Sequence, residues 1–486
     1  MAKITKQSDN FSKWYTDVIL DADLADYGPV KGTMVVKPYG FSLWTNIRDS
    51  LNKMIEDSGH DNAYFPLFIP KSFLEKEAKH VEGFAKECAV VTHSKLISEE
   101  GSLTVDPESK LEEEIIVRPT SETIIWHMFK KWITSYRDLP LKVNQWANVV
   151  RWEMRTRLFL RTSEFLWQEG HTAHATKEEA MKETLEIVEI YRTLFEDYLA
   201  IPTIIGRKSN LERFAGADET FSIETMMRDK KALQAGTSHY LGTNFGSAFD
   251  VKFQSKDNKE HPVYATSWGV STRMVGALIM VHGDDKGLKI PPKIAPTQVV
   301  IVPINPKKEK SEEFSSFVMK VEKKLIHLDI RTHIDDLDES PGFKFNKWEL
   351  KGVPIRIEIG LKEFENMEVT VCRRDNSEKY QIQIDKIDEI PTILQSIQDN
   401  LFNDAKTFMD NNTCTVSSFA DFTDTLSKNN QFIKAYWDGT DETELKIKEK
   451  TKATIRCIVE DNEDSSNKCI FSGETAKHLV VFAKAY

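Results

Sequence analysis

Two neighbouring segments with strand-like alternation constrain this chain more than any other feature of its sequence. VNQWANVVRWEMR begins at Val143, and FLWQEGHTAHAT follows from Phe165 after a short polar connection. Strands joined this closely pair most economically as an antiparallel hairpin. Long helical patterns flank them, such as EEAMKETLEIVEIYRTLFEDYLA. The sequence therefore predicts an α+β domain in which an antiparallel sheet is flanked by helices.

The second strand of this hairpin carries an unusual set of side chains on one face. Because side chains alternate across a strand, Phe165, Trp167, Glu169 and His171 point the same way. Two aromatic rings, a carboxylate and an imidazole fit either of two explanations. They form a core strand whose polar members have found partners, or they form the floor of a ligand pocket.

Three arginines near this strand favour the pocket. Arg151 and Arg161 flank the hairpin, and Arg273 comes just after Gly269, where a strand gives way to a predicted helix. Guanidinium groups suit phosphate and carboxylate, and a helix N-terminus adds positive potential. A single arginine is usually a surface salt-bridge partner, but three beside a polar strand face predict an anion-binding pocket.

Familiar nucleotide and zinc motifs do not occur in the chain. There is no P-loop, no Rossmann glycine pattern and no HExxH segment, so a nucleotide would be held in another way. A serine hydrolase stays an alternative, because candidate nucleophiles and bases are present. These are Ser121 and Ser238, with His127, His171 or His239.

Composition limits where the protein works. No apolar run approaches the ~20 residues of a membrane helix, and the N-terminus has no apolar signal segment, so we expect a cytoplasmic protein with no membrane contact. Five scattered cysteines agree with a reducing compartment. The net charge of −11 argues against indiscriminate nucleic-acid binding and confines any RNA contact to part of the surface.

Element patterns divide the chain into three predicted domains. The α+β domain covers 1–290, a proline-rich stretch forms a linker, an α/β domain covers 296–402, and a small α+β unit covers 410–486. Within the first domain, the acidic segment 98–114 is predicted to be a solvated loop. In the second, a helix is predicted to run through the Lys/Glu-rich stretch to Leu328.

Several long blocks resemble a known family. KGTMVVKPYG with the helix after it, RWEMR with FLRTSEFLWQEGH, and SWGVSTRMVGAL resemble motifs 1, 2 and 3 of class II aminoacyl-tRNA synthetases. RPTSET at 118–123 and QAGTSHYLGTNF at 234–245 narrow this to prolyl-tRNA synthetases of the archaeal/eukaryotic-like type. The resemblance weakens only in the tail. It implies a class II catalytic domain, an anticodon-binding domain and a C-terminal extension.

The resemblance implies a proline–tRNA ligase that uses ATP and Mg²⁺. Proline would attack the α-phosphorus of ATP, giving prolyl-adenylate and pyrophosphate, and the prolyl group would pass to the 3′ end of tRNA(Pro). Bacterial-type relatives carry an editing insertion between motifs 2 and 3. Here the interval from Phe165 to Trp268 is filled by a helix and the active-site blocks, so no editing domain is expected. Motif 1 implies a homodimer, with its interface around Lys37, Pro38 and the helix from Trp44 to Met54.

For ATP, the resemblance assigns two catalytic residues. Arg151 would contact the α-phosphate and the carboxylate of proline, and Arg273 would contact the γ-phosphate. Phe165 would stack on adenine. The other ATP contacts implied are Glu153, Arg161, Thr162, Gln234, Thr237 and Ser271.

For proline, the resemblance implies that the polar strand face is a pocket floor. Thr120 and Glu122 would hold the imino nitrogen. Trp167, Glu169 and His171 would line the pyrrolidine pocket. His239 would lie close by.

The C-terminal unit departs from the family pattern. Relatives often hold zinc there through two close pairs of cysteines. Trp437 and Glu442 stand near the place of the first pair, and Phe471 replaces the partner of Cys469 in the second. Because structural zinc takes four ligands, no zinc is expected. The alternative ligand set, with irregular spacing, is Cys414, Cys457 and Cys469.

Two further alternatives remain from the sequence alone. One is a non-catalytic paralogue that binds tRNA, and the other is a synthetase for threonine, serine or glycine. In the α/β domain, basic residues interleaved with aromatics fit either RNA recognition or an ordinary surface. These basic residues are Arg331, Lys344, Lys347, Lys351, Arg356, Arg373 and Arg374.

Overall fold

The predicted hairpin forms the centre of the computed structural model, which describes residues 4–78, 87–99, 101–304 and 312–486. β9 (Leu141–Val150) and β10 (Glu164–His174) pair antiparallel, as predicted, with Phe165 opposite Val149. β10 pairs on its other side with β16 (Tyr264–Ser271). The sheet then continues, in spatial order, through β13 (Ala232–Gly242), β12 (Glu219–Met226) and β11 (Ile204–Arg207), and β3 (Asp61–Asn62) lies beyond β9.

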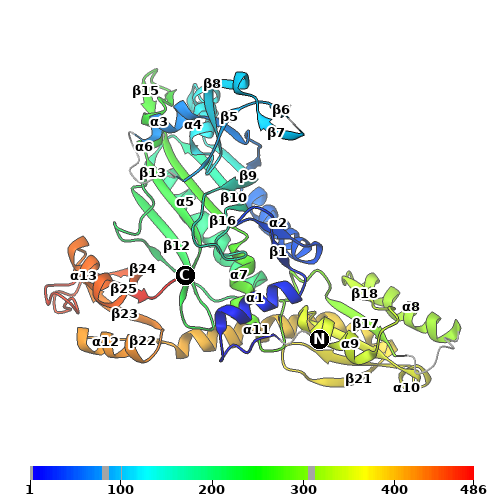
Figure 1. The fold of residues 1–486 in the computed structure, drawn as a ribbon. Coiled ribbons are helices and arrows are strands. Elements are labelled where there is room, and N and C mark those ends of the chain that lie inside the picture. The colour runs from blue at the N-terminus through cyan, green and yellow to red at the C-terminus, as the bar shows by residue number, and fades with distance from the viewer. Residues whose placement is uncertain (1–3, 79–86, 100, 305–311) are drawn as a thin grey trace.

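Helices pack around this sheet, as Figure 1 shows. The long predicted helix is α5 (Lys177–Thr193), which starts at a capping box between Thr176 and Glu179, continues into a π-helical turn at Leu194–Tyr198 and packs on β12, β13 and β16. The others are α1 (Phe11–Asp21), α2 (Pro38–Asp57), α3 (Lys71–Ala78), α4 (Glu122–Trp132), α6 (Asn244–Ala248) and α7 (Arg273–His282).

The first domain also contains smaller strands, and some of them lie where a loop was predicted. Segment 98–114 is not a loop: most of its described residues belong to β6 (Leu96–Glu99), β7 (Ser102–Val105), a 3₁₀ turn (Pro107–Ser109) and β8 (Lys110–Val117). Leu96, Leu103 and Val105 on this hairpin are exposed, so no buried face marks it in the sequence. The remaining elements are β1 (Ala25–Tyr27), β2 (Met34–Val36), β4 (Phe68–Pro70), β5 (Ala89–His93), a 3₁₀ turn (Tyr136–Asp138), β14 (Lys252–Gln254) and β15 (Glu260–Pro262).

The helix after motif 1 packs mainly inside its own chain. α2 has proline at its first position and ends before Gly59, whose φ of +84° suits a residue without a side chain. Trp44, Ile47 and Leu51 are buried in the main core, against residues of α1, α5 and α7. The apolar stripe of this helix is therefore occupied, and any contact with a second copy would need its outer face.

The interval from Phe165 to Trp268 is described in full and holds no separate inserted domain. It contains β10, α5, β11 to β13, α6, β14 and β15, and runs into β16. These elements account for the whole interval between motifs 2 and 3.

The second domain is a mixed sheet flanked by helices, as predicted. Its strand order is β18 (Thr332–Ile334), β17 (Val299–Pro303), β19 (Ile355–Ile359), β20 (Glu368–Arg373) and β21 (Lys379–Gln383), with β17 parallel to β18 and β19. Residues 305–311 of the predicted helix lie outside the described residues, and α8 covers Glu312–His327. The other helices are α9 (Pro341–Leu350), α10 (Leu361–Glu365), a 3₁₀ segment (Ile384–Glu389) and α11 (Ile390–Asn411).

The basic residues of this domain contact the rest of the chain. Arg374 forms an ion pair with Asp284, and Lys351 forms one with Asp23, so these two hold the domain against the first. The other basic residues named above also bond within the chain, to carboxylates or backbone carbonyls: Arg331, Lys344, Lys347, Arg356 and Arg373. All seven therefore have structural roles within the chain.

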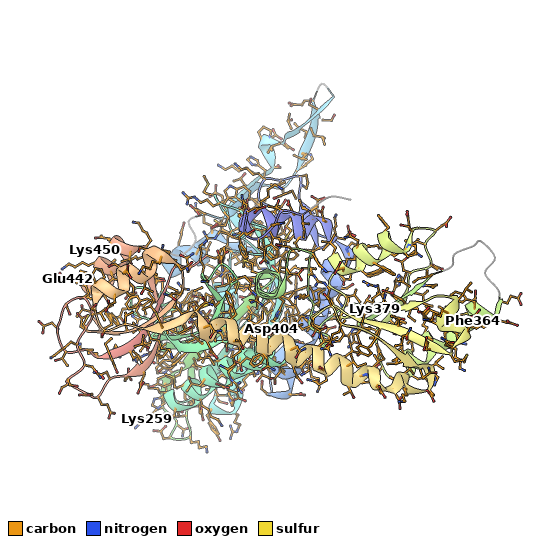
Figure 2. The ribbon with its side chains drawn as sticks, turned by 90° about the horizontal axis from the view of Figure 1, so that it is seen from below. Lys259, Phe364, Lys379, Asp404, Glu442 and Lys450 are labelled. Carbon is orange, nitrogen blue, oxygen red and sulfur yellow. The ribbon has the colours of Figure 1, made fainter. Side chains whose placement is uncertain are left out.

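The C-terminal unit extends the catalytic sheet. Its strands are β22 (Thr413–Thr415), β23 (Phe432–Trp437), β24 (Thr454–Asp461) and β25 (His478–Ala483), with helices α12 (Phe419–Lys428) and α13 (Asp441–Thr451). Arg207 in β11 pairs with Ile458 in β24, so the sheet runs from the first domain into the third. The α11 helix crosses the predicted boundary near 402 without interruption. Figure 2 shows it passing Asp404 between the α/β domain and this unit. The predicted boundaries stay a prediction.

Candidate functional site

A cavity of about 560 Å³ opens over the polar face of β10. Its wall includes ten of the residues predicted to bind proline or ATP, contributed by β10, β13, α4 and the segments that precede and follow them: Thr120, Glu122, Arg151, Glu153, Trp167, Glu169, His171, Gln234, Thr237 and His239. Five predicted residues are not in this wall: Arg161, Thr162, Phe165, Ser271 and Arg273. The pocket explanation for the strand face is therefore favoured over a plain core strand.

The floor of the cavity is a buried hydrogen-bond network around Glu169. The Ser121 hydroxyl donates to Glu169 Oε1, and Gln145 Nε2 donates to the same oxygen at 2.8 Å. His171 Nε2 lies 3.3 Å from Glu169 Oε2. Burial alone would raise the pKa of Glu169, but these partners outweigh it and lower the pKa. The network fixes a charged carboxylate and the imidazole beside it.

The His171–Glu169 pair should make stability depend on pH. Burial would lower the pKa of His171, but the hydrogen bond to Glu169 and the charges of Glu122 and Glu169 raise it overall. The pair therefore contributes fully between the unfolded values of Glu and His, about pH 4.5 to 6.5. Its contribution is lost as the pH rises through the higher folded-state pKa of His171. Urea unfolding of wild type and His171→Gln should differ most in that window. A difference independent of pH would contradict it.

Hydroxyl groups hold two other residues of the wall. Thr120 donates to the Glu122 carboxylate, and both are buried. His239 lies between the hydroxyls of Thr220 and Thr237, at 2.9 Å and 3.1 Å. Burial and the nearby His171 lower the pKa of His239 to about 3, so this ring is neutral near pH 7.

Arg151 forms a side wall together with two aromatic rings. Its Nε donates to the Pro119 carbonyl at 2.9 Å. The guanidinium carbon lies 5.5 Å from the ring centre of Phe165 and 5.4 Å from that of Trp167. Cation–π contacts of this kind hold a guanidinium in place while its remaining N–H groups stay available.

Arg273 and Arg161 line a second, smaller cavity of about 150 Å³. Arg273 donates to the carbonyls of Leu160, at 3.2 Å, and Gln234, at 3.4 Å. Burial, with the charges of Arg161 and Arg151, lowers the pKa of Arg273 to about 10. Other residues of this cavity are Arg155, Arg157, Leu233 and the C-terminal Tyr486. The predicted phosphate arginines are thus divided between two neighbouring cavities.

Three of the predicted ATP residues have local roles. The Thr162 hydroxyl donates to the Glu164 carbonyl at 2.6 Å, and Ser271 Oγ accepts the backbone N–H of Arg273 at 3.3 Å. Glu153 pairs with Arg161 at 3.4 Å. Their contacts with ATP stay predictions.

Sequence reasoning did not assign several wall and floor residues to the site, and four of them show why. Ser121 and Trp268 lie inside the quoted motif blocks, so the motifs themselves could have indicated them. Gln145 carried the same alternation signal as the rest of its strand. Lys208, by contrast, reaches the cavity from just after β11, and no motif marks it.

The hydrolase alternative finds no support here. The Ser121 hydroxyl is committed to Glu169 rather than to a histidine. The Ser238 hydroxyl is buried and has no hydrogen-bond partner among the described residues. A serine nucleophile needs a base within hydrogen-bond reach.

Among the described residues, one group of metal-ligating side chains comes close together: Glu122, Glu169 and His171. The alternative zinc set does not form such a group there, and its members sit in two different hydrophobic clusters. Cys414 and Cys469 belong to one of these clusters, and Cys457 lies in the other. No described helix has both the length and the apolar character that a membrane crossing needs.

Family models match three successive parts of the chain. The tRNA synthetase class II core domain (G, H, P, S and T) matches residues 104–282. An anticodon binding domain matches 298–393, and the C-terminal domain of prolyl-tRNA synthetase matches 419–486. The order agrees with the three predicted units.

Full-length relatives agree with these matches. A proline–tRNA ligase of Flavobacterium johnsoniae is 54% identical, with 99% of each chain covered, and one of Cytophaga hutchinsonii is 53% identical over the full length of both. A crystal structure of prolyl-tRNA synthetase from Cryptosporidium parvum, complexed with halofuginone and AMPPNP, superposes with a TM-score of 0.93 at 38% identity. The match covers 100% of this chain and 99% of the Cryptosporidium parvum chain. The chain therefore belongs to the prolyl-tRNA synthetase family of class II aminoacyl-tRNA synthetases.

Proposed function

We propose that this chain is a proline–tRNA ligase that activates L-proline with ATP and transfers it to tRNA(Pro). One observation carries the proposal: a single cavity brings together buried carboxylates, an imidazole, an indole ring and a fixed guanidinium. Carboxylates suit the cationic nitrogen of proline, the indole suits its apolar ring, and the guanidinium suits its carboxylate.

The chain's own groups account for most of the binding. Glu122 and Thr120 would hold the imino nitrogen, and Arg151 would hold the proline carboxylate and the α-phosphate together. His171 Nδ1 is buried and has no hydrogen-bond partner among the described residues, so a polar ligand could satisfy it. Holding two reactants in one orientation supplies much of the rate in a transfer that needs little acid–base chemistry.

The nucleotide would extend from Arg151 towards the second cavity. Phe165 offers an aromatic face for adenine, and Arg161 and Arg273 offer positive charge for the outer phosphates. Mg²⁺ would come with ATP, since carboxylate and amide oxygens such as those of Glu153 and Gln234 suit a hard cation. The metal would supply charge neutralisation on the phosphates.

ATP–pyrophosphate exchange tests the function. Purified protein with Mg²⁺ is assayed against proline, alanine, cysteine, threonine, serine and glycine. Exchange driven most strongly by proline is expected. If another amino acid drove it more strongly, the synthetase reaction would stand but the proline assignment would fail. If none drove it, a non-catalytic tRNA-binding protein would become the better proposal.

We infer that the protein acts as a cytoplasmic homodimer. Exposed apolar side chains support a partner surface near motif 1, because Tyr27, Val30, Val35 and Phe41 are all exposed there. Light scattering after size exclusion should give about twice the 55.8 kDa of one chain. A monomer mass at micromolar concentration would overturn it.

We also infer that the C-terminal unit folds without zinc. Trp437 fills its core where relatives place a cysteine pair, and Phe419 packs edge-on against Phe471 with ring centres 4.8 Å apart. Such packing supplies stability that zinc-dependent units obtain from metal. Elemental analysis should find far less than one zinc per chain, and unfolding should not change with EDTA. One tightly held zinc per chain would contradict this.

A further inference from the structure

A buried charge cluster joins the C-terminal unit to the catalytic sheet. Glu224 in β12 accepts from Lys208 Nζ at 2.7 Å and from Arg456 Nε at 3.0 Å. The side chains are 0%, 1% and 7% exposed, respectively. Lys208 Nζ also donates to the Arg456 carbonyl at 2.7 Å. Arg456 belongs to β24, so one member of the cluster comes from the C-terminal unit.

The cluster lies against the nucleotide end of the proposed site. Lys208 is in the wall of the main cavity. Glu224 is opposite Gln234 across the β12–β13 pair, next to a register shift between Ile223 and Glu224. Gln234 lines the cavity, and its carbonyl accepts from Arg273. Movement of Glu224 would therefore be passed to Lys208, Gln234 and Arg273.

Arg456 determines whether this cluster has a net positive charge. Burial would raise the pKa of Glu224, but the charges of Lys208 and Arg456 lower it, so the carboxylate stays ionised. Without Arg456, Lys208 and Glu224 would balance only each other. The positive surplus that the cluster now presents to an anionic ligand would then disappear.

The end of the chain contacts the same hairpin at a second place. Ala232, the first residue of β13, donates its N–H to the Lys484 carbonyl at 2.9 Å, and its own carbonyl accepts from the N–H of Tyr486 at 3.1 Å. The Tyr486 hydroxyl donates to Asp229 at 2.7 Å. The C-terminal unit thus bonds to the β12–β13 hairpin at its turn as well as at Glu224.

We propose that Arg456 is a positioning residue for ATP: by holding Glu224 and Lys208, the C-terminal unit sets the nucleotide end of the catalytic cavity. This rests on the proposed function. Arg456 does not itself line either cavity, so its effect is carried by the residues it contacts. The C-terminal unit is then a working part of the catalytic site.

Arg456→Met tests the proposal through a split between substrates. The KM for ATP in exchange should rise about tenfold, the size of coupling seen within ionic networks, while the KM for proline changes much less. Glu224→Gln in the same chain removes the negative charge that then cancels Lys208, so the positive surplus returns and most of the ATP affinity should be restored. Arg456→Lys keeps the charge, so its KM for ATP should lie between those of the wild type and Arg456→Met. Asp461→Asn is the control, because it breaks an exposed ion pair between the same two units, Arg207–Asp461.

Binding of AMPPNP by calorimetry gives a readout that needs no turnover. Weaker binding in Arg456→Met, recovered in the double variant, would support the proposal. Unchanged AMPPNP binding would overturn it, as would equal losses for ATP and proline that the double variant does not recover. Wild-type protein without proline-dependent exchange would instead contradict the proposed function, and the calorimetric comparison would still decide the role of Arg456.

Discussion

Arg151→Ala should lower kcat/KM for proline-dependent ATP–pyrophosphate exchange by about 10² to 10³-fold, as loss of one preorganised charge contact does. The fall should be large because Arg151 is held by the Pro119 carbonyl and by two aromatic rings, so its guanidinium needs no reorganisation when charge develops on the α-phosphate. Steady-state exchange with each substrate varied in turn measures the effect.

Two companion variants make this result specific. Arg151→Lys keeps the charge but loses the planar fork, so it should recover only part of the activity. Arg192→Ala removes an arginine of α5 whose ion pairs, with Glu189 and Glu196, are partly exposed and involve no residue of the cavity walls, and exchange should be unchanged. Near-normal activity in Arg151→Ala would remove this residue from the catalytic role.

Glu169→Ala should damage both folding and proline use. The change strips the acceptor from the buried groups of Ser121, Gln145 and His171, and breaking a buried charged pair typically costs about 3–5 kcal/mol of unfolding free energy. Proline binding should fall with it, because His171 loses the partner that orients its ring. Urea unfolding followed by circular dichroism, together with the KM for proline, measures the two effects.

Glu169→Gln separates the effect on stability from the effect on proline binding. Glutamine keeps an oxygen for Ser121 or Gln145 but cannot balance a charged imidazole, so the loss of stability should be smaller and the loss of proline affinity should persist. If Glu169→Ala unfolded within 1 kcal/mol of wild type, the network would not have the structural role given to it here.

The sequence anticipated the parts of the fold that bury a periodic apolar face. The β9–β10 hairpin, α5 and the strand-to-helix passage at Arg273 follow such patterns. The β6–β7 hairpin was not predicted because none of its residues is fully buried, and α11 crosses the predicted domain boundary with no break in its pattern. Local patterns cannot report these features.

Prediction of the site from the sequence has a different limit. Alternation placed Trp167, Glu169 and His171 on one face correctly, because a strand's geometry is local. The division of the arginines into two cavities depends on how separate strands meet. The same holds for Lys208, whose neighbours in space, Glu224 and Arg456, are far away in sequence. Only the folded chain brings them together.

The pairing of β11 with β24 also bears on solubility. A strand at the end of a sheet exposes unpaired N–H and C=O groups that can recruit another chain and begin aggregation. In this protein β24 follows β11 in the sheet order, so the C-terminal unit caps a border of the catalytic sheet that would otherwise be open. A shortened chain ending before residue 410 would uncover that border and the apolar surface beneath Phe432 and Val481. Residues 410–486 thus cover a border of the first domain that could otherwise pair with a second chain.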